Sequence, residues 1–159
     1  MYFSTDYSSP IGDMLIASDG EAICGVWFYG QKHFSSTVGK TVKNDDLAIF
    51  KKAKTFFDDY FEAKNPKIDF RLRPEGSEFR RKVWKILSEI PYGKTMTYGE
   101  IASGISPRMS AQAVGGAVGN NPISILIPCH RVLGAGGKLT GYAAGIDKKI
   151  ELLKLEKIM

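Results

Sequence analysis

One stretch decides the fold class of the second half of this chain: TYGEIASGISPRMSAQAVGGAVG, residues 97–119. Thr97 and Glu100 have the spacing of a capping box, which predicts that a short helix begins at this point. Glycine and proline in residues 104–107 end that helix, and Ser110 is placed to cap a second one. Two short helices joined by a tight turn are typical of a helix-turn-helix.

The second helix of this motif, residues 111–119, has an unusual composition. Its two adjacent glycines, Gly115 and Gly116, each cost about 1 kcal/mol relative to alanine in a helix interior. Their missing side chains allow another surface to approach the helix closely. That surface is either a nucleic-acid groove or a neighbouring helix, and the pattern alone leaves both interpretations open.

A second informative motif, Pro128-Cys129-His130-Arg131, follows the helix-turn-helix. The chain has two cysteines and two histidines, and this motif places one of each side by side. A thiolate is a strong nucleophile, and a nearby imidazole can help to form one near neutral pH. The alternative is a structural cysteine beside an unrelated histidine, because free cysteines are often buried and inert.

Two more helices are predicted in the second half. Ser77 is placed to cap a helix whose apolar face carries Phe79, Val83, Leu87 and Ile90. Pro91-Tyr92-Gly93 ends that helix. Asp147 is placed to cap a final amphipathic helix whose apolar side carries Ile150, Leu153 and Ile158.

The first half has the pattern of a small antiparallel sheet. Strands are predicted at residues 2–7, 14–17 and 22–29, because apolar and β-branched residues there lie between turn signals. Ser9-Pro10 ends the first strand, and Ser18-Asp19-Gly20 is a good hairpin turn. The polar residues that follow, 31–44, predict a loop.

A helix is predicted next, over residues 45–63, and Asn65-Pro66 ends it. One side of this helix carries Leu47, Phe50, Lys54, Phe57 and Phe61. Residues 68–72 alternate as in a further strand or an extended linker. The predicted fold class is α+β, with an N-terminal domain over residues 1–72 and a mostly helical C-terminal domain over residues 73–159.

Charge separates the two halves of the chain. Residues 1–70 contain 8 lysines and 10 acidic residues, a net −2, whereas residues 71–159 contain 14 basic and 7 acidic residues, a net +7. A basic half suggests contact with a polyanion, and the alternative is that this charge only aids solubility. The sequence shows no signal peptide and no apolar run near the roughly 20 residues that span a bilayer. We therefore expect reduced cysteines and a cytoplasmic protein.

Taken together, the motifs from Phe79 to Glu156 resemble one known family, the O6-alkylguanine-DNA alkyltransferases, also called methylated-DNA–protein-cysteine methyltransferases. They follow the family's order and spacing: Val83-Trp84-Lys85, Ile90-Pro91-Tyr92-Gly93-Lys94-Thr95, Thr97-Tyr98-Gly99-Glu100-Ile101-Ala102, Ala113-Val114-Gly115-Gly116-Ala117, Asn121-Pro122, Ile127-Pro128-Cys129-His130-Arg131-Val132, Leu139-Thr140-Gly141-Tyr142 and Leu152-Leu153. The N-terminal half fits the family's ribonuclease-H-like α/β domain more weakly.

The resemblance implies a single-turnover DNA repair reaction, in which the alkyl group of an O6-alkylguanine moves to Cys129. His130 would take the thiol proton through a water molecule, and Glu156 would orient the imidazole. Asn121 would tie the helix-turn-helix to the cysteine loop, and Tyr98 would donate a hydrogen bond to guanine N3. The sequence does not decide whether O4-alkylthymine is also a substrate.

The resemblance also implies a guanine pocket and a DNA surface. Tyr142 would stack on the flipped base, the Ala143 N–H would face O6, and the Cys129 and Val132 carbonyls would accept from the exocyclic amine. The glycine-bearing helix would enter the minor groove of double-stranded DNA. The expected DNA contacts are Gln112, Ala113, Gly115, Gly116, Arg108 and Thr95.

One of these residues, Gln112, departs from the family pattern. Most relatives have an arginine there, which fills the space left by the flipped base. Gln112 can hydrogen-bond an orphaned base but lacks cation–π attraction. We hypothesise that Gln112 still inserts, with weaker DNA affinity. The alternative is that Arg108, in a connection one residue longer than usual, reaches in.

We expect no cofactor and no metal site in this chain, because the metal ligands of the family's N-terminal half are missing. Cys24 and His33 are the two candidate ligands in the first half, whereas a structural zinc needs four. The expected partner is double-stranded DNA that carries an alkylated guanine, bound by a monomer, with no membrane involved. The expected location is the cytoplasm with the nucleoid, or the nucleus of a eukaryote.

Two other functions remain as alternatives. A non-catalytic alkylguanine lesion reader would recruit other repair factors, but such relatives lack the cysteine that Cys129 supplies. A cysteine hydrolase would use Cys129 and His130, but no oxyanion-hole signature accompanies them, and the glycine-rich helix would then have no role.

Overall fold

A computed structural model describes all residues of the chain, 1–159, and their contacts divide it into two compact units. One unit contains residues 1–75 and 122–124, and the other contains residues 76–121 and 125–159. The fold class is α+β, as the sequence predicted. No helix in the structure combines the length and the hydropathy that a membrane span requires.

The N-terminal unit contains a four-stranded sheet with the order β3-β2-β1-β4. The strands β1 (Phe3–Ser9), β2 (Gly12–Ser18) and β3 (Ile23–Phe28) pair antiparallel, which confirms the three predicted strands. The short strand β4 (Val42–Lys43) pairs parallel with β1. The prediction of a loop over residues 31–44 is wrong at β4, because two residues are too few to show an alternating pattern.

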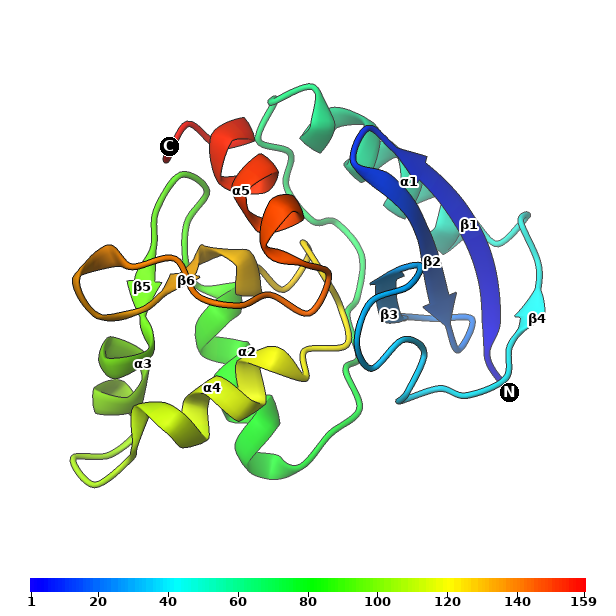
Figure 1. Ribbon diagram of the computed structural model, residues 1–159. Helices are drawn as coiled ribbons and strands as arrows, with labels where there is room; N and C mark the ends of the chain where they lie inside the picture. Colours follow the sequence, from blue (N-terminus) through cyan, green and yellow to red (C-terminus); the bar gives the residue numbers. More distant parts are fainter. The chain divides into compact units, whose positions relative to one another are not determined.

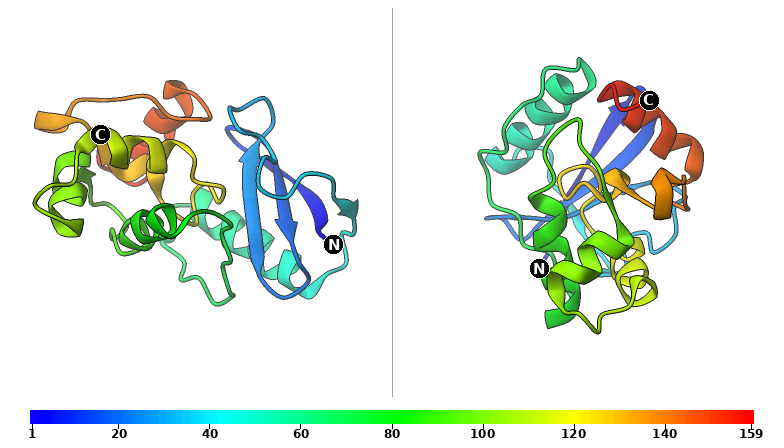
Figure 2. Two further views of the ribbon diagram at one scale, coloured as in Figure 1. Left: turned by 90° about the horizontal axis from the view of Figure 1, so that it is seen from below. Right: turned by 90° about the vertical axis from the view of Figure 1, so that its left-hand side faces the viewer.

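The helix of this unit, α1 (Ala48–Phe61), packs against β1 and β2 on one face of the sheet (Figures 1 and 2). Of the residues expected on one side of this helix, Phe50 and Phe57 are buried, whereas Leu47, Lys54 and Phe61 are half-buried. The buried residues are Ile49, Phe50, Ala53, Phe56, Phe57 and Tyr60.

Two extended segments pair with β3 and complete the N-terminal unit. Residues 71–73 exchange backbone hydrogen bonds of 2.8 Å with Ile23, so the alternating stretch at 68–72 is an extended linker with a single bridge. Residues 122–124 pair with Val26 at 2.8 and 3.0 Å. They belong to this unit although they follow the helix-turn-helix in sequence, which the sequence did not predict.

The C-terminal unit contains the remaining helices, α2 (Glu78–Ser88), α3 (Tyr98–Ile105), α4 (Ala111–Gly119) and α5 (Ile146–Leu155). The short strands β5 (Met96–Thr97) and β6 (Val132–Leu133) pair in parallel. Two single-turn 3-10 helices, η1 (Cys129–Arg131) and η2 (Ala135–Gly137), flank β6.

The helix-turn-helix predicted from residues 97–119 is confirmed. Helices α3 and α4 pack together, and α2 packs against α4 (Figure 1). The three predicted caps are present, because Ser77 accepts a hydrogen bond from a backbone N–H of the first turn of α2 and Ser110 does so for α4. Thr97 and Glu100 form the complete capping box of α3.

The predicted cap of the last helix is wrong. Helix α5 begins after Gly145, and Asp147 lies inside its first turn. Gly145 has a φ of +105°, which a residue with a side chain rarely adopts, and its N–H donates to the Tyr142 carbonyl at 2.8 Å. A glycine turn thus starts the helix where a side-chain cap was expected.

Candidate active site

The loop that carries Cys129 is tied to the end of α4 by Asn121. The side-chain amide of Asn121 donates to the Ile127 carbonyl at 2.8 Å, and the Cys129 N–H donates to the same oxygen at 2.8 Å. Buried Ile125 has a φ of +69°, which is rare for a β-branched residue and costs about 1–3 kcal/mol. The backbone that presents Cys129 is therefore held in one shape.

The Cys129 thiol is buried, since only 6% of the residue is exposed. Burial raises the pKa of this thiol, because a nonpolar environment disfavours the thiolate. Hydrogen bonds from the side chains of Asn121 and Tyr142, and the positive charge of Lys149, lower the same pKa. The resting sulfur is a protonated thiol, so forming the thiolate requires a group that takes its proton.

Glu156 gathers the polar groups next to the cysteine. His130 Nε2 lies 2.6 Å from Glu156 Oε2, and both side chains are buried. Arg131 binds the same carboxylate with Nε at 2.7 Å and Nη2 at 3.1 Å, and its Nη1 donates to the Ile90 carbonyl at 2.7 Å. The Gly93 N–H donates to Oε1 at 3.1 Å. Both carboxylate oxygens are thus fixed by donors from separate segments.

Burial also lowers the pKa of His130, and the positive charges of Arg131 and Lys149 act in the same direction, against the opposing effect of Glu156. The imidazole is therefore neutral at pH 7. Because Nε2 faces Glu156, proton exchange with the sulfur falls to Nδ1. Cys129, His130 and Glu156 have the order of nucleophile, base and orienting carboxylate.

The residues expected to form a base pocket lie in the same unit. Tyr142 and Ala143 are half-buried in the loop before α5, and the interaction of the Tyr142 side chain with the Cys129 thiol lowers the pKa of that thiol. Tyr98 is the first residue of α3, also half-buried, and its hydroxyl lies 3.0 Å from Thr140 Oγ1. The segment 138–144 therefore contacts both the cysteine and the start of the helix-turn-helix.

One residue of this site was not predicted from the sequence, Lys149. Lys149 is buried, and its Nζ donates to the Val132 carbonyl at 2.6 Å and to Thr140 Oγ1 at 3.3 Å. Helical spacing could have indicated that Lys149 lies on the buried face of α5, because it precedes buried Leu152 and Leu153 by three and four positions.

The exposed side of α4 is almost bare of side chains. Gln112, Ala113 and Gly116 are exposed, and a Cβ added at Gly116 would meet no atom within 4 Å. A Cβ at Gly115 would lie 3.9 Å from the Tyr98 ring, which is an ordinary contact. Packing against a neighbouring helix therefore does not require Gly116, which favours close approach by an outside surface.

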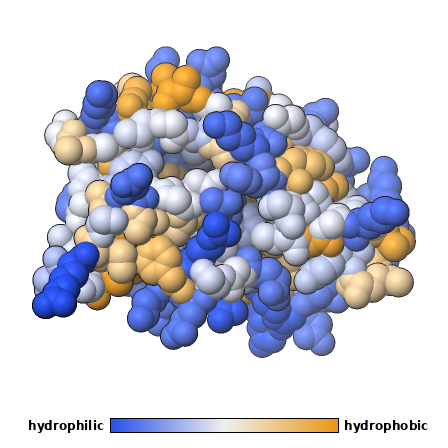
Figure 3. Space-filling view, turned by 60° about the horizontal axis from the view of Figure 1, so that its bottom comes forward, coloured by the Kyte–Doolittle hydropathy of each residue, from blue (hydrophilic) through white to orange (hydrophobic).

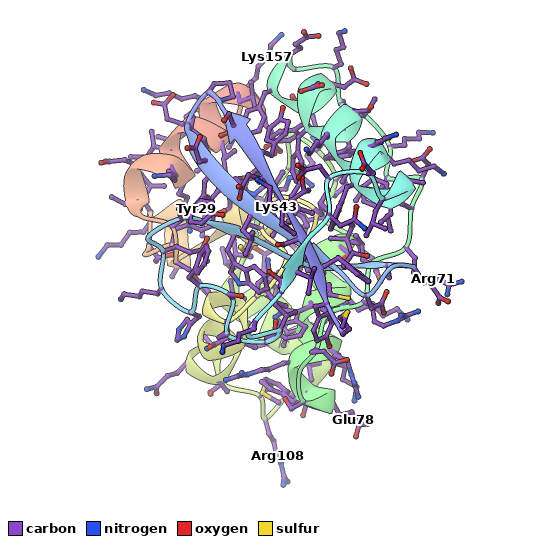
Figure 4. The ribbon with its side chains drawn as sticks, turned by 90° about the vertical axis from the view of Figure 1, so that its right-hand side faces the viewer. Tyr29, Lys43, Arg71, Glu78, Arg108 and Lys157 are labelled. Atoms are coloured by element: carbon purple, nitrogen blue, oxygen red, sulfur yellow. The ribbon has the colours of Figure 1, made fainter.

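Arg108 and Thr95 are two expected DNA contacts that lie outside α4. Arg108 is exposed in the loop between α3 and α4, and its side chain extends away from the fold (Figure 4). Figure 3 shows hydrophobic and neutral surface beside strongly hydrophilic side chains on one face of the molecule. Thr95 is exposed in the segment that precedes β5.

Cys24 is buried like Cys129, but it lies in the other unit of the chain. It lies in β3 with 1% of the residue exposed, and burial raises its pKa to about 11. Its sulfur lies 3.7 Å from the Ala22 carbonyl. The structure brings together no group of three or more histidine, cysteine, aspartate or glutamate side chains that could hold a metal ion.

Comparisons with known proteins support the interpretation of both halves. The family model for the 6-O-methylguanine DNA methyltransferase DNA-binding domain matches residues 78–158, and the model for the ribonuclease-like domain of the same family matches residues 1–74. A methylated-DNA–protein-cysteine methyltransferase from Methanosarcina acetivorans is 46% identical over 156 residues, covering 98% of each chain.

Solved structures agree with these matches. The crystal structure of Mycobacterium tuberculosis O6-methylguanine methyltransferase is 40% identical, with a TM-score of 0.88, and the match covers 99% of this chain and 93% of that one. The Mycobacterium tuberculosis OGT in complex with DNA is 41% identical, with a TM-score of 0.86, over 98% and 92% of the two chains. The resemblance identified in the sequence is confirmed, and the chain belongs to the 6-O-methylguanine DNA methyltransferase family.

Proposed function

We propose that this protein repairs DNA by moving the alkyl group of O6-alkylguanine irreversibly to the Cys129 sulfur. The observation that carries the proposal is that buried Cys129 is followed in the chain by His130, whose buried imidazole is held 2.6 Å from the Glu156 carboxylate. In this proposal the three residues supply a nucleophile, a proton acceptor and a fixed countercharge. The family membership and the names of its relatives support the same reaction.

The reaction balances with the residues of this site. The thiol proton passes through water to His130, and Glu156 stabilises the imidazolium. A sulfur lone pair forms the S–C bond while the C–O6 bond breaks, and the bonding pair moves into the purine. The resulting guanine anion regains a proton from solvent, which in turn receives the proton from His130. No step regenerates the thiol, so each molecule acts once.

The pocket recognises guanine through hydrogen bonds to the edge of the base. In this proposal Tyr142 stacks on the flipped base, and the Ala143 N–H faces O6. The Cys129 and Val132 carbonyls accept from the exocyclic amine, and Tyr98 donates to N3 as negative charge develops. Asn121 acts by holding the Ile127 carbonyl and the sulfur in place.

The DNA surface in this proposal is the exposed side of α4. A monomer places Ala113, Gly115 and Gly116 in the minor groove of double-stranded DNA, and either Gln112 or Arg108 fills the space left by the flipped nucleotide. The exposed positions of Gln112 and Arg108 support both alternatives. A cytoplasmic location with the nucleoid, or a nuclear one in a eukaryote, completes the proposal.

A stoichiometric repair measurement tests the function. The protein is mixed in increasing amounts with a duplex that contains one O6-methylguanine, and the remaining lesion is measured after nuclease digestion by chromatography. We expect one lesion to disappear per protein molecule, after which repair stops. Tight binding without loss of the lesion would instead identify a lesion reader.

The pKa shifts of the site predict the pH dependence of the reaction. Burial lowers the pKa of His130 below 6.5 and raises that of Cys129 above 9.0, so the neutral pair is the main form between those values. We expect the single-turnover rate at saturating protein to be flat from pH 6.5 to 9.0 and to fall only below pH 6.5, where His130 becomes protonated. A rate that is already halved above pH 6.5 would contradict this assignment.

The Gly116→Ala variant is expected to change stability and DNA affinity in opposite directions. Alanine stabilises the helix by about 1 kcal/mol, since its Cβ has open space within the protein. DNA affinity should fall on the order of tenfold, because the new methyl group separates α4 from the groove. Urea unfolding and a DNA dissociation constant at fixed salt measure the two effects.

Gly104→Ala is the matched control for this variant. Gly104 is also exposed in a helix, α3, and a Cβ there also meets nothing within 4 Å. We expect Gly104→Ala to stabilise the protein without weakening DNA binding. Equal DNA affinity for Gly116→Ala and the original protein would remove α4 from the proposed interface.

A further inference from the structure

Lys149 is a buried cation that the reaction described above does not use. Only 1% of the residue is exposed, and burial lowers its pKa, while attraction to the Cys129 sulfur raises it. An ammonium group is costly to bury unless its hydrogen bonds are satisfied. Its two acceptors are the Val132 carbonyl and Thr140 Oγ1, and these contacts indicate its role in the site.

The contacts of Lys149 continue through Thr140 to Tyr98. Lys149 Nζ lies 3.3 Å from Thr140 Oγ1, which lies 3.0 Å from the Tyr98 hydroxyl. An ammonium group can only donate, so Thr140 accepts from Lys149 and its own proton stays available for Tyr98. In the arrangement that we infer, Thr140 donates to the Tyr98 oxygen, which leaves the Tyr98 proton for an acceptor outside the protein. The hydrogen bonds then run in one direction, from the cation to the phenol.

We propose that Lys149 and Thr140 are positioning residues that act through Tyr98 on the leaving guanine. This inference rests on the proposed function. When the C–O6 bond breaks, its electron pair spreads over the purine to N3, and the hydrogen bond from Tyr98 strengthens. The stronger hydrogen bond increases the negative charge on the Tyr98 oxygen, and Thr140 and Lys149 stabilise that charge. No proton leaves Lys149, so the balance of the reaction is unchanged.

The second contact of Lys149 gives the same cation a role in base selection. Its Nζ donates to the Val132 carbonyl at 2.6 Å, and in the proposed pocket that carbonyl accepts from the exocyclic amine. N3 and the exocyclic amine lie on the same edge of guanine, the edge that faces the minor groove. One buried group thus supports two of the protein contacts with that edge, the one from Tyr98 and the one from Val132.

Thr140→Val tests the series of hydrogen bonds from Lys149 to Tyr98, because valine keeps the shape of threonine and removes the hydroxyl. The probe is a duplex with O6-methylguanine, compared with a duplex in which O6-methyl-3-deazaguanine replaces it and N3 is absent. We expect Thr140→Val to slow the single-turnover rate about tenfold on the first duplex, the effect of one hydrogen bond to an ionised group. The DNA dissociation constant should not change.

The 3-deaza duplex separates this role from a structural one. Any loss of folded protein would slow transfer from both substrates equally. The hydrogen bonds that run from Lys149 through Thr140 and Tyr98 end at N3, so they should affect the rate only when N3 is present. We expect the rate on the 3-deaza duplex to be the same for Thr140→Val and the original protein. Thr140→Ser, which keeps the hydroxyl, should restore the rate on O6-methylguanine.

Tyr98→Phe and Lys149→Met complete the test. If Thr140 acts through Tyr98, adding Thr140→Val to Tyr98→Phe should cause no further loss. Lys149→Met should slow transfer on both duplexes, because it also removes the contact with the Val132 carbonyl and the charge that acts on Cys129, but the loss should be larger on O6-methylguanine. Equal effects of Thr140→Val on both duplexes, or no effect on either, would overturn the inference. A failure of the original protein to transfer methyl at all would instead reject the proposed function.

Discussion

We expect the Cys129→Ser variant to transfer no methyl group while it keeps its fold and its affinity for DNA. The change replaces one buried sulfur atom with oxygen, so the contacts around residue 129 are preserved. A serine hydroxyl is far less acidic than a thiol, and a neutral imidazole such as His130 gives it no appreciable alkoxide. The stoichiometric repair measurement should show no loss of O6-methylguanine, at an unchanged DNA dissociation constant and melting temperature.

Cys24→Ser is the matched control, because it makes the same chemical change at the other cysteine. Cys24 is buried in β3, and its pKa of about 11 leaves it protonated. We expect this variant to repair one lesion per molecule, as the original protein does. Repair by Cys129→Ser, or its absence in folded Cys24→Ser, would show that the nucleophile has been assigned to the wrong cysteine.

The Glu156→Gln variant is expected to lose both reaction rate and stability. Without the carboxylate, His130 loses the group that holds its Nε2 proton and stabilises its charged form. The rate should fall by about 10²–10⁴-fold, the usual contribution of a positioned general base. Arg131 is left as a buried cation without a partner, which should cost about 3–5 kcal/mol. Single-turnover kinetics and urea unfolding measure the two losses.

A double variant separates the two losses. Glu156→Gln combined with Arg131→Met removes the unpaired cation as well as the carboxylate. We expect part of the stability to return, because no buried charge then lacks a counterion. The rate should remain low, since His130 still has no carboxylate beside Nε2. Recovery of the rate together with the stability would mean that Glu156 only supports the fold.

The local features of the C-terminal unit could be predicted from the sequence. The caps at Ser77, Thr97 and Ser110 were predicted correctly because each depends on residues within one helical turn. The cysteine and histidine of the active site are adjacent in sequence, so the sequence alone suggested that they act together. Glu156 was assigned only through the family resemblance, since no local pattern links it to His130.

Features that depend on distant partners were not predicted. Strand β4 exists because it pairs with β1, and residues 122–124 are extended because they pair with Val26. Lys149 was not singled out, because its acceptors lie 17 and 9 positions away along the chain. Asp147 was predicted as a cap, but the turn at Gly145 determined where α5 begins.

The most direct test of the central claim is to locate the transferred methyl group by mass spectrometry. The protein is incubated with a duplex that contains O6-methylguanine, its intact mass is measured, and its proteolytic peptides are then sequenced. We expect a gain of one methyl group per molecule, on the peptide that contains Cys129 and not on the one that contains Cys24. A methyl group on any other residue, or loss of the lesion with no gain in protein mass, would contradict the claim.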